Sequence, residues 1–115
     1  MNGFPEELAA CTGFDWDANN IDKNWERHRV SVSECEQVFF QRPMFIAPDP
    51  EHSQVEPRYA ALGQTASGRR LTIVFTIRGT AIRVISARDM SRRERRKYEQ
   101  PPEKAGCKGE DSQVP

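Results

Sequence analysis

The sequence predicts an α+β fold in which an antiparallel sheet packs against helices. Two segments rich in apolar residues, 58–65 and 69–77, flank the turn-forming pair Ser67-Gly68, and a third, 81–88, follows the turn "RGT". Two segments with helical spacing precede these strands. We therefore expect a meander of three long strands, extended by short edge strands, with two N-terminal helices on its apolar face and a short C-terminal helix.

The first elements are a brief strand and a helix. Residues 14–17, "FDWD", alternate aromatic and acidic side chains, and Asp17 is placed to cap a helix over about 18–29. One face of that helix holds Ile21, Trp25 and His28. Residues 1–13 are expected to form a loose leader without an export signal.

The second helix begins with a capping box. Ser31 stands three residues before Glu34, and Val30 with Cys35 is placed to form the accompanying hydrophobic staple. The helix is expected to reach about Phe40. Its expected buried residues are Cys35, Val38 and Phe39. Residues 44–47 then form a short strand, and 48–57 form a loop by composition.

The register of the long strands depends on the length of their two turns. If each turn holds two residues, Tyr59 lies opposite Thr76, and Arg83 projects from the same face as both. The opposite face then carries Ile73, Phe75 and Val84. A change of one residue in either loop would exchange the faces.

The C-terminal helix, over 92 to about 99, is unusual because it is almost entirely polar. Ser91 and Glu94 again have capping-box spacing, but Tyr98 is the apolar residue within the helix. Such a helix must be held by Tyr98 and arginine stems packing on the sheet, or by a partner. Residues 100–115 have the composition of a disordered tail, which leaves 14–99 as a single domain.

Charge is separated along the chain, although the net charge is zero. Residues 1–57 carry four Lys/Arg and eleven Asp/Glu, whereas 58–99 carry eleven and three. This separation indicates a basic face with an anionic partner; mutual neutralisation of the two halves within the fold is the alternative. The three cysteines form no disulfide or zinc pattern, so we expect a reduced, cytoplasmic protein with no membrane span.

Three stretches resemble the BrnT family of bacterial toxins. They are "FDWD…N…H…VS", "EHSQVEPRYAALGQTASGRRLTIVFT" and "RVISARDMSRRERRKYE". The resemblance implies a fold similar to the RelE-like ribonucleases and a toxin of a type II toxin–antitoxin pair that inhibits growth by cleaving RNA. It also implies neutralisation by a BrnA-like antitoxin that carries a ribbon–helix–helix DNA-binding domain. The sequence departs from the family after the histidine, where Arg29 stands in place of the usual glycine.

Metal-independent RNA cleavage needs a proton acceptor, a proton donor and cations around the phosphorane. We expect catalytic roles for His28, Arg58, Arg83 and Arg88, and RNA contacts from Tyr59, Arg78, Arg92 and Arg93. We expect the antitoxin to cover Arg88, Arg92 and Tyr98. The competing interpretation of His28 is a histidine at the edge of the core that bonds to the backbone. Glu94 is a second candidate base, although its role in the capping box already accounts for its presence.

No metal-ligand cluster, phosphate-binding loop or Ser/His/Asp order is present in the sequence, so we expect neither cofactor nor metal. The basic face also fits a nucleic-acid-binding module without catalysis, or a module for protein interaction.

Overall fold

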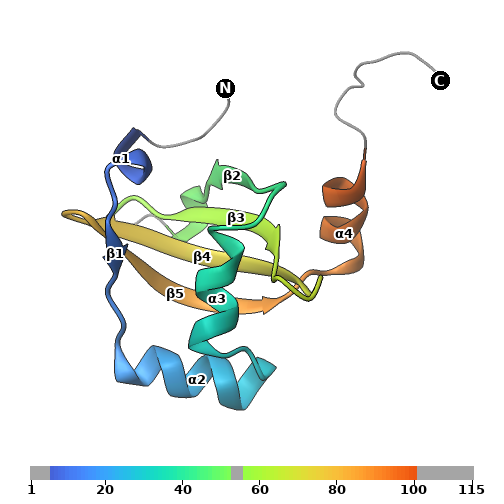
Figure 1. Cartoon of the computed structure of the whole chain (residues 1–115), viewed down its shortest axis with the longest axis horizontal. Helices are drawn as coiled ribbons and strands as arrows, with labels where there is room; N and C mark the ends of the chain where they lie inside the picture. The colour runs from blue at the N-terminus through green and yellow to red at the C-terminus, as the bar shows by residue number, and fades with distance from the viewer. Residues whose placement is uncertain (1–5, 53–55, 101–115) are drawn as a thin grey trace.

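A mixed sheet forms the centre of the computed structural model, which describes residues 6–52 and 56–100. Its five strands stand in the order β1-β5-β4-β3-β2 (Figure 1). Their bounds are β1 Gly13–Phe14, β2 Phe45–Pro48, β3 Tyr59–Gln64, β4 Arg70–Arg78 and β5 Ala81–Asp89. β1 pairs parallel to β5 and the other neighbours are antiparallel. The predicted α+β class and the central meander are confirmed.

The turn between β3 and β4 is longer than predicted, and this changes the register. Gln64 pairs with Arg70, and the Thr65 amide donates to the Arg69 carbonyl oxygen at 2.9 Å, so the loop holds residues 66–68. Gly68 closes the loop with φ +94°, a conformation that glycine adopts without a Cβ clash. Tyr59 consequently lies opposite Phe75, and its predicted place opposite Thr76 is wrong.

The β4–β5 turn has the predicted two residues, because Arg78 pairs with Ala81. Arg83 therefore lies opposite Thr76, as expected. A bulge between Val74 and Phe75 shifts the pairing farther along the hairpin. Such a shift bends and twists the strand pair locally, and nothing in the local sequence announces it.

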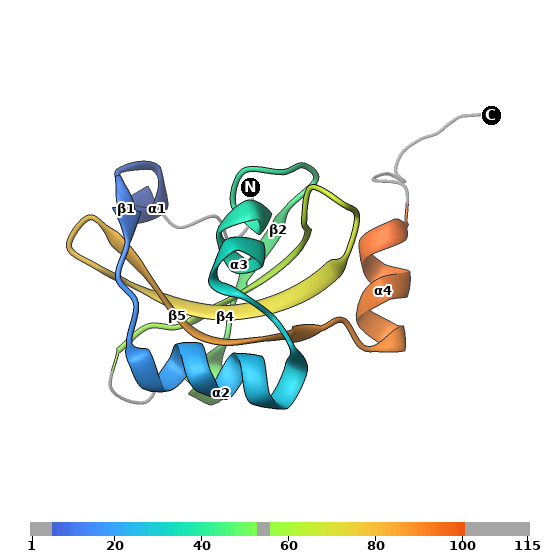
Figure 2. The same cartoon turned by 60° about the horizontal axis from the view of Figure 1, so that its bottom comes forward.

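α3 (Val32–Val38) covers the apolar face of the sheet (Figures 1 and 2). Its predicted capping box is present, with the Glu34 amide 3.1 Å from Ser31 Oγ and the Ser31 amide 3.0 Å from Glu34 Oε1. The core on this face includes Val30, Cys35, Val38, Phe39, Ala61, Leu71, Ile73, Phe75 and Val84. The predicted burial of the staple residues and of the helix's apolar side is confirmed.

α2 (Ala18–His28) runs beside β5, at the edge of the sheet (Figure 2). Asp17 caps it as predicted, and Asn20 and Asn24 reach the strand: Asn20 Nδ2 donates to the Val84 carbonyl, and Asn24 Oδ1 accepts from the Ala87 amide. These contacts satisfy backbone groups of β5 that would otherwise need water. Trp25, on the predicted apolar face, is instead 47 % exposed.

The N-terminal segment differs from the expected loose leader. Residues 6–9 form the helical turn α1, Leu8 joins the buried core, and the strand predicted at 14–17 is the shorter β1. Residues 1–5 lie outside the described part. The loop predicted at 48–57 contains the last strand residue, Pro48, and a 3₁₀ turn over Pro50–His52.

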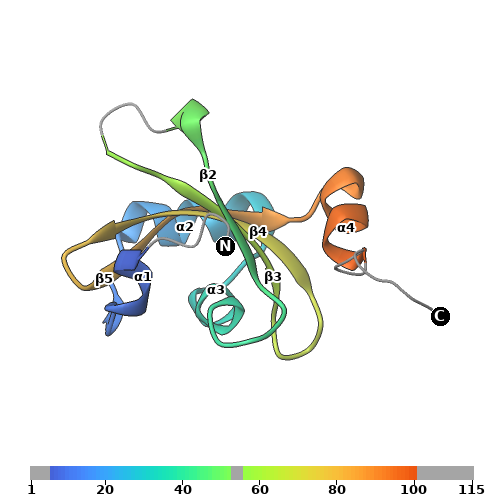
Figure 3. The ribbon, with the colours of Figure 1, turned by 90° about the horizontal axis from the view of Figure 1, so that it is seen from above.

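α4 (Arg92–Glu99) lies at the end of the sheet where β5 finishes, away from the β4–β5 turn (Figure 3). Ser91 and Glu94 form the predicted capping box. Tyr98 is buried and holds the helix to the sheet: its hydroxyl donates to the Pro43 carbonyl at 2.7 Å, and its ring packs on Phe45 at 5.7 Å. The expected tail falls almost entirely on residues 101–115, which lie outside the described residues.

Candidate functional site

Arg83 is paired within the fold. Its two Nη atoms donate to Asp15 Oδ2 at 3.1 Å and Asp17 Oδ2 at 2.9 Å, and its side chain is 18 % exposed. Arg83 thereby ties the β1–α2 connection to β5. An arginine whose fork already binds two carboxylates has few donors left for a phosphate.

The arginines of the sheet region that were predicted to be catalytic, together with Arg78, which was predicted to contact RNA, do not form one cluster. Arg58 and Arg78 flank Glu56, with Nη2 to carboxylate distances of 3.9 and 3.3 Å, near the end of β4. Arg83 lies on the neighbouring strand, whereas Arg88 is near the other end of β5. Neutralisation between the acidic and basic halves of the sequence therefore accounts for much of the charge of Arg58, Arg78 and Arg83.

Arg88 belongs to a network that fixes the start of α4. Its Nη1 and Nη2 donate to the two oxygens of Glu94 at 2.8 and 2.9 Å, and Glu94 Oε1 also accepts from Thr72 Oγ1 and the Ser91 amide. The hydrogen bonds from Arg88 lower the pKa of Glu94 to about 2, although burial opposes the shift. So acidic a carboxyl group is a weak base, and Glu94 acts as a structural anchor.

Tyr59 and Tyr98 both pack against other rings. The Tyr59 ring lies 5.6 Å from that of Phe75, on the face that α3 covers, and the hydroxyl of Thr76 donates on the other side to the Pro57 carbonyl. Tyr98 is 6 % exposed, so a partner has little of it to cover. Tyr98 is therefore buried within the fold, whereas Tyr59 is partly exposed and lines a small pocket with Pro57 and Thr76.

Several cations of α4 differ from the arginines of the sheet, because they have no ion-pair partner among the described residues. Within the described part of the chain, the exposed side chains of Arg92, Arg93, Arg96 and Lys97 make no hydrogen bond or ion pair. Arg92 and Arg93 are in the first turn, where the helix dipole disfavours positive charge by a few tenths to about 1 kcal/mol each. Unpaired cations in an unfavourable field are available for an anion.

Arg69 is a central residue that the sequence analysis missed. Its guanidinium donates to the His28 and Arg29 carbonyls at 2.9 and 2.8 Å, to both oxygens of Glu34 at 3.1 and 3.2 Å, and to both oxygens of Asp89 at 2.8 and 3.1 Å. It therefore binds the C-terminus of α2, the start of α3 and the end of β5. Its partners lie 20 to 41 residues away in sequence, and no local pattern signals such contacts.

Arg69 links the end of α2, at His28, to Asp89, the strand residue that precedes the start of α4. The hydrogen bond from Arg69 lowers the pKa of the Asp89 carboxyl and burial opposes the shift, while electrostatic interactions with Arg69, His28 and Arg95 add to the lowering. His28 and Arg95 are thus both electrostatic neighbours of Asp89. We call the region formed by residues 28–29, 88–89 and 92–95 the α2–α4 junction.

Arg29 ends α2 in the left-handed conformation, with φ 54° and ψ 40°. It is the one non-glycine among the described residues with positive φ, and this conformation costs a residue with a Cβ about 1 kcal/mol. Its guanidinium carbon lies 5.2 Å from the Trp25 ring centroid, a contact worth about 0.5–1 kcal/mol at an exposed site. Arg29 therefore stands in a conformation that the glycine usual in the family adopts without a Cβ clash.

The α2–α4 junction combines a titratable imidazole with unpaired cations. An imidazole can accept or donate a proton near neutral pH, and guanidinium groups bind phosphate oxygens through paired hydrogen bonds. Of the predicted site residues, His28, Arg88, Arg92 and Arg93 belong to this region, whereas Arg58, Arg78 and Arg83 do not. The arrangement suits binding of a phosphodiester and proton transfer beside it.

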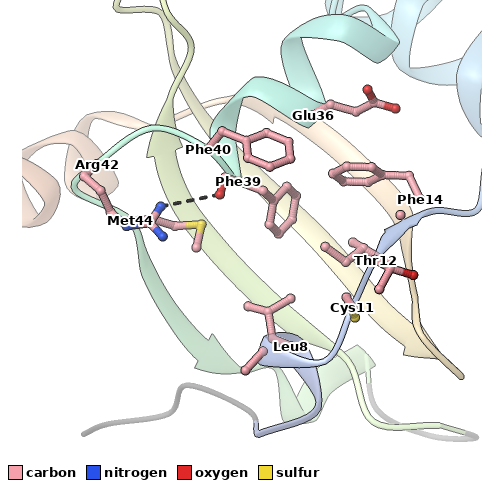
Figure 4. Close-up of a pocket in the computed structure, with 12 residues that line it drawn as sticks. Leu8, Cys11, Thr12, Phe14, Glu36, Phe39, Phe40, Arg42 and Met44 are labelled. Carbon is pink, nitrogen blue, oxygen red and sulfur yellow. Dashed lines mark hydrogen bonds between the residues drawn. The ribbon is translucent and has the colours of Figure 1, made fainter.

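A pocket of about 500 Å³ lies elsewhere, between the N-terminal segment and the end of α3 (Figure 4). Phe14, Phe39, Phe40 and Met44 give it an apolar wall, with Glu36 and Arg42 among its polar side chains. None of the predicted site residues lines it. Among the described residues, no group of three or more His, Cys, Asp or Glu is placed to hold a metal ion, and no helix has the length and apolar character that crossing a membrane requires.

Comparison with known proteins agrees with these observations. The family model "Ribonuclease toxin, BrnT, of type II toxin-antitoxin system" matches residues 16–94. The fold is similar to the crystal structure of the Brucella abortus ribonuclease toxin BrnT, with a TM-score of 0.54 and 19 % identity over 70 % of this chain and 99 % of that one. No curated protein is significantly similar to the chain. The match over most of the fold shows that this chain belongs to the BrnT family of ribonuclease toxins of type II toxin–antitoxin systems.

Proposed function

We propose that this toxin is a metal-independent endoribonuclease, RelE-like in its use of positioned side chains, and that it cuts RNA at the α2–α4 junction. The observation that carries the proposal is that Arg69 ties the end of α2, at His28, to Asp89, the last residue of β5, and that the exposed cations of α4 follow directly in the chain. The family's ribonuclease description supports the reaction class.

In the proposed reaction, His28 accepts the proton of a 2′-hydroxyl, whose oxygen attacks the adjacent phosphorus. The bond to the 5′-oxygen breaks, and that oxygen takes up a proton, which leaves a 2′,3′-cyclic phosphate and a 5′-hydroxyl. Arg92, Arg93 and Arg95 lie in the first turn of α4 and, in this proposal, stabilise the negative charge of the phosphorane. Arg88 is a positioning residue, because it holds Glu94 and with it the first turn of α4.

The test is cleavage of a labelled single-stranded RNA in EDTA by protein freed of its antitoxin. We expect wild-type cleavage, no cleavage when the scissile nucleotide is 2′-deoxy, and a loss of about 10²- to 10⁴-fold in His28→Gln. His52→Gln is the matched control, since His52 lies in the β2–β3 connection and is expected to leave the rate unchanged.

Three outcomes would contradict the proposal. Cleavage only after a divalent metal is restored would refute metal independence. Full activity in His28→Gln would show that another group moves the proton. Tight RNA binding without cleavage would favour the alternative function, a nucleic-acid-binding module.

We further propose that the antitoxin is BrnA-like, with a ribbon–helix–helix domain through which the complex binds its operator DNA, and that the pair acts in the cytoplasm. A type II toxin family implies an antitoxin. The exposed cations of α4 fit acidic residues on that partner, with Arg92 as a contact and Arg88 at its edge. Hydrogen exchange with and without the antitoxin checks this: residues 88–97 should become protected, and protection confined to other segments would refute it.

A further inference from the structure

Trp25 is an exposed aromatic side chain that packing of the fold does not explain. The contacts of α2 with β5 are made by Asn20 and Asn24, whereas Trp25 is 47 % exposed on the same helix. A single exposed apolar residue is common on protein surfaces. The indole of Trp25, however, carries a guanidinium above its ring and is three residues from His28.

Arg29, which supplies that guanidinium, occupies a position where glycine would be less strained. Its strain and its contact with Trp25 are of similar size and opposite sign, so folding alone gives little reason for an arginine there. An arginine kept in a left-handed conformation at a candidate site is a reason to look for a ligand.

The backbone beneath the pair is held firmly. Arg69 binds the carbonyl oxygens of both His28 and Arg29, so the last turn of α2 is fixed relative to the end of β5. The Trp25–Arg29 pair is therefore held at a defined place, with Arg29 in the α2–α4 junction and Trp25 next to it. A fixed platform loses little conformational entropy when it binds a flexible ligand.

We propose that Trp25 and Arg29 form a subsite for one unpaired nucleotide of the RNA, next to the scissile phosphate. The base stacks on the indole and displaces the guanidinium, which then binds that nucleotide's phosphate. Aromatic stacking recognises single-stranded bases in a way that tolerates sequence, and arginine recognises the phosphate. The inference rests on the proposed function, because it places the subsite along the same RNA.

The test uses a short 2′-O-methyl oligoribonucleotide, which binds but is not cut. In Trp16→Phe, Trp25 is the sole indole, and its fluorescence should be quenched as the oligonucleotide is added. Trp25→Ala should weaken binding by about 5- to 100-fold, as loss of one stacked base does. An unchanged dissociation constant in Trp25→Ala, with wild type still cleaving RNA, would overturn the subsite and leave the proposed function standing.

Arg29→Gly separates binding from folding. It removes the strained conformation, so the melting temperature should stay or rise, while the affinity for the oligonucleotide should fall by about 5-fold or more. Arg27→Ala removes a cation from the same turn without touching the indole and is the control. Equal losses in the two variants would mean general attraction of the backbone and would overturn the subsite. Wild type that neither binds nor cuts RNA would refute the proposed function itself.

Discussion

Replacing Arg69 by alanine is expected to lower the free energy of unfolding by about 2–4 kcal/mol. It is also expected to reduce the rate of RNA cleavage by more than the smaller fraction of folded protein explains. Arg69 makes six hydrogen bonds that join three elements. Its side chain is 26 % exposed. Removing the guanidinium leaves the carboxylates of Glu34 and Asp89 without this donor. The two carbonyl groups at the C-terminus of α2 lose it as well.

The magnitude follows from how well each partner is solvated. Asp89 is 58 % exposed, so its ion pair is screened and contributes about 0.2–1 kcal/mol. Glu34 is 27 % exposed, and hydrogen bonds from a charged donor to it and to the two carbonyls contribute about 0.5–1.5 kcal/mol each, after discounting for partial exposure. These contributions overlap because one side chain makes them all, which limits the total to the range given.

The assay is urea denaturation followed by circular dichroism, with Arg96→Gln as the control because Arg96 is exposed and unpaired among the described residues. Arg69→Lys should recover only part of the stability, since an ammonium group cannot span three elements as the guanidinium does. The reasoning is refuted if Arg69→Ala costs less than about 0.5 kcal/mol, the value expected of an ordinary surface change.

Three further predictions concern stability. Gly63→Ala should cost about 1–3 kcal/mol in denaturant unfolding, because the new Cβ would lie 2.7 Å from Val38 Cγ1; an unchanged midpoint would show that the helix moves away freely. The pKa of Glu94 is lowered on folding to about 2, so the contribution of its carboxylate to stability is present above pH 4.5 and lost as the pH falls toward 2. The melting temperature of Glu94→Gln should therefore vary less with pH across that range than that of the wild type. Equal dependence on pH in the two proteins would count against Glu94 as a structural anchor. Arg83→Lys should lower the melting temperature but leave the cleavage rate of folded protein within about threefold, whereas a selective loss of rate would restore Arg83 to the catalytic site.

The elements that the sequence predicted well are governed by local chemistry. Both capping boxes, at Ser31 and Ser91, are present, because a cap depends on residues three positions apart. The position of Arg83 opposite Thr76 was also correct, since the β4–β5 turn is short and its length is readable. Tyr98 holding α4 to the sheet was one of two alternatives, and the structure selects it.

The predictions that were wrong, and the contacts that were missed, depend on residues far apart in sequence or on a difference of one residue in a loop. Tyr59 was placed on the wrong face because the β3–β4 loop has one residue more than the Ser-Gly pair indicates. The pairing of Arg83 with Asp15 spans 68 residues, and a cation count cannot reveal it. Arg69 was overlooked for the same reason, because its role exists only once α2, α3 and β5 are assembled.

The location of the RNA site is the claim on which the whole account depends, and amide chemical shifts with an uncleavable oligonucleotide test it most directly. With a 2′-O-methyl oligoribonucleotide added to the antitoxin-free protein, the largest changes should fall at residues 25–30, 88–89 and 92–96. Changes concentrated around Glu56 or in the apolar pocket near Phe40, with the α2–α4 junction unaffected, would contradict the account.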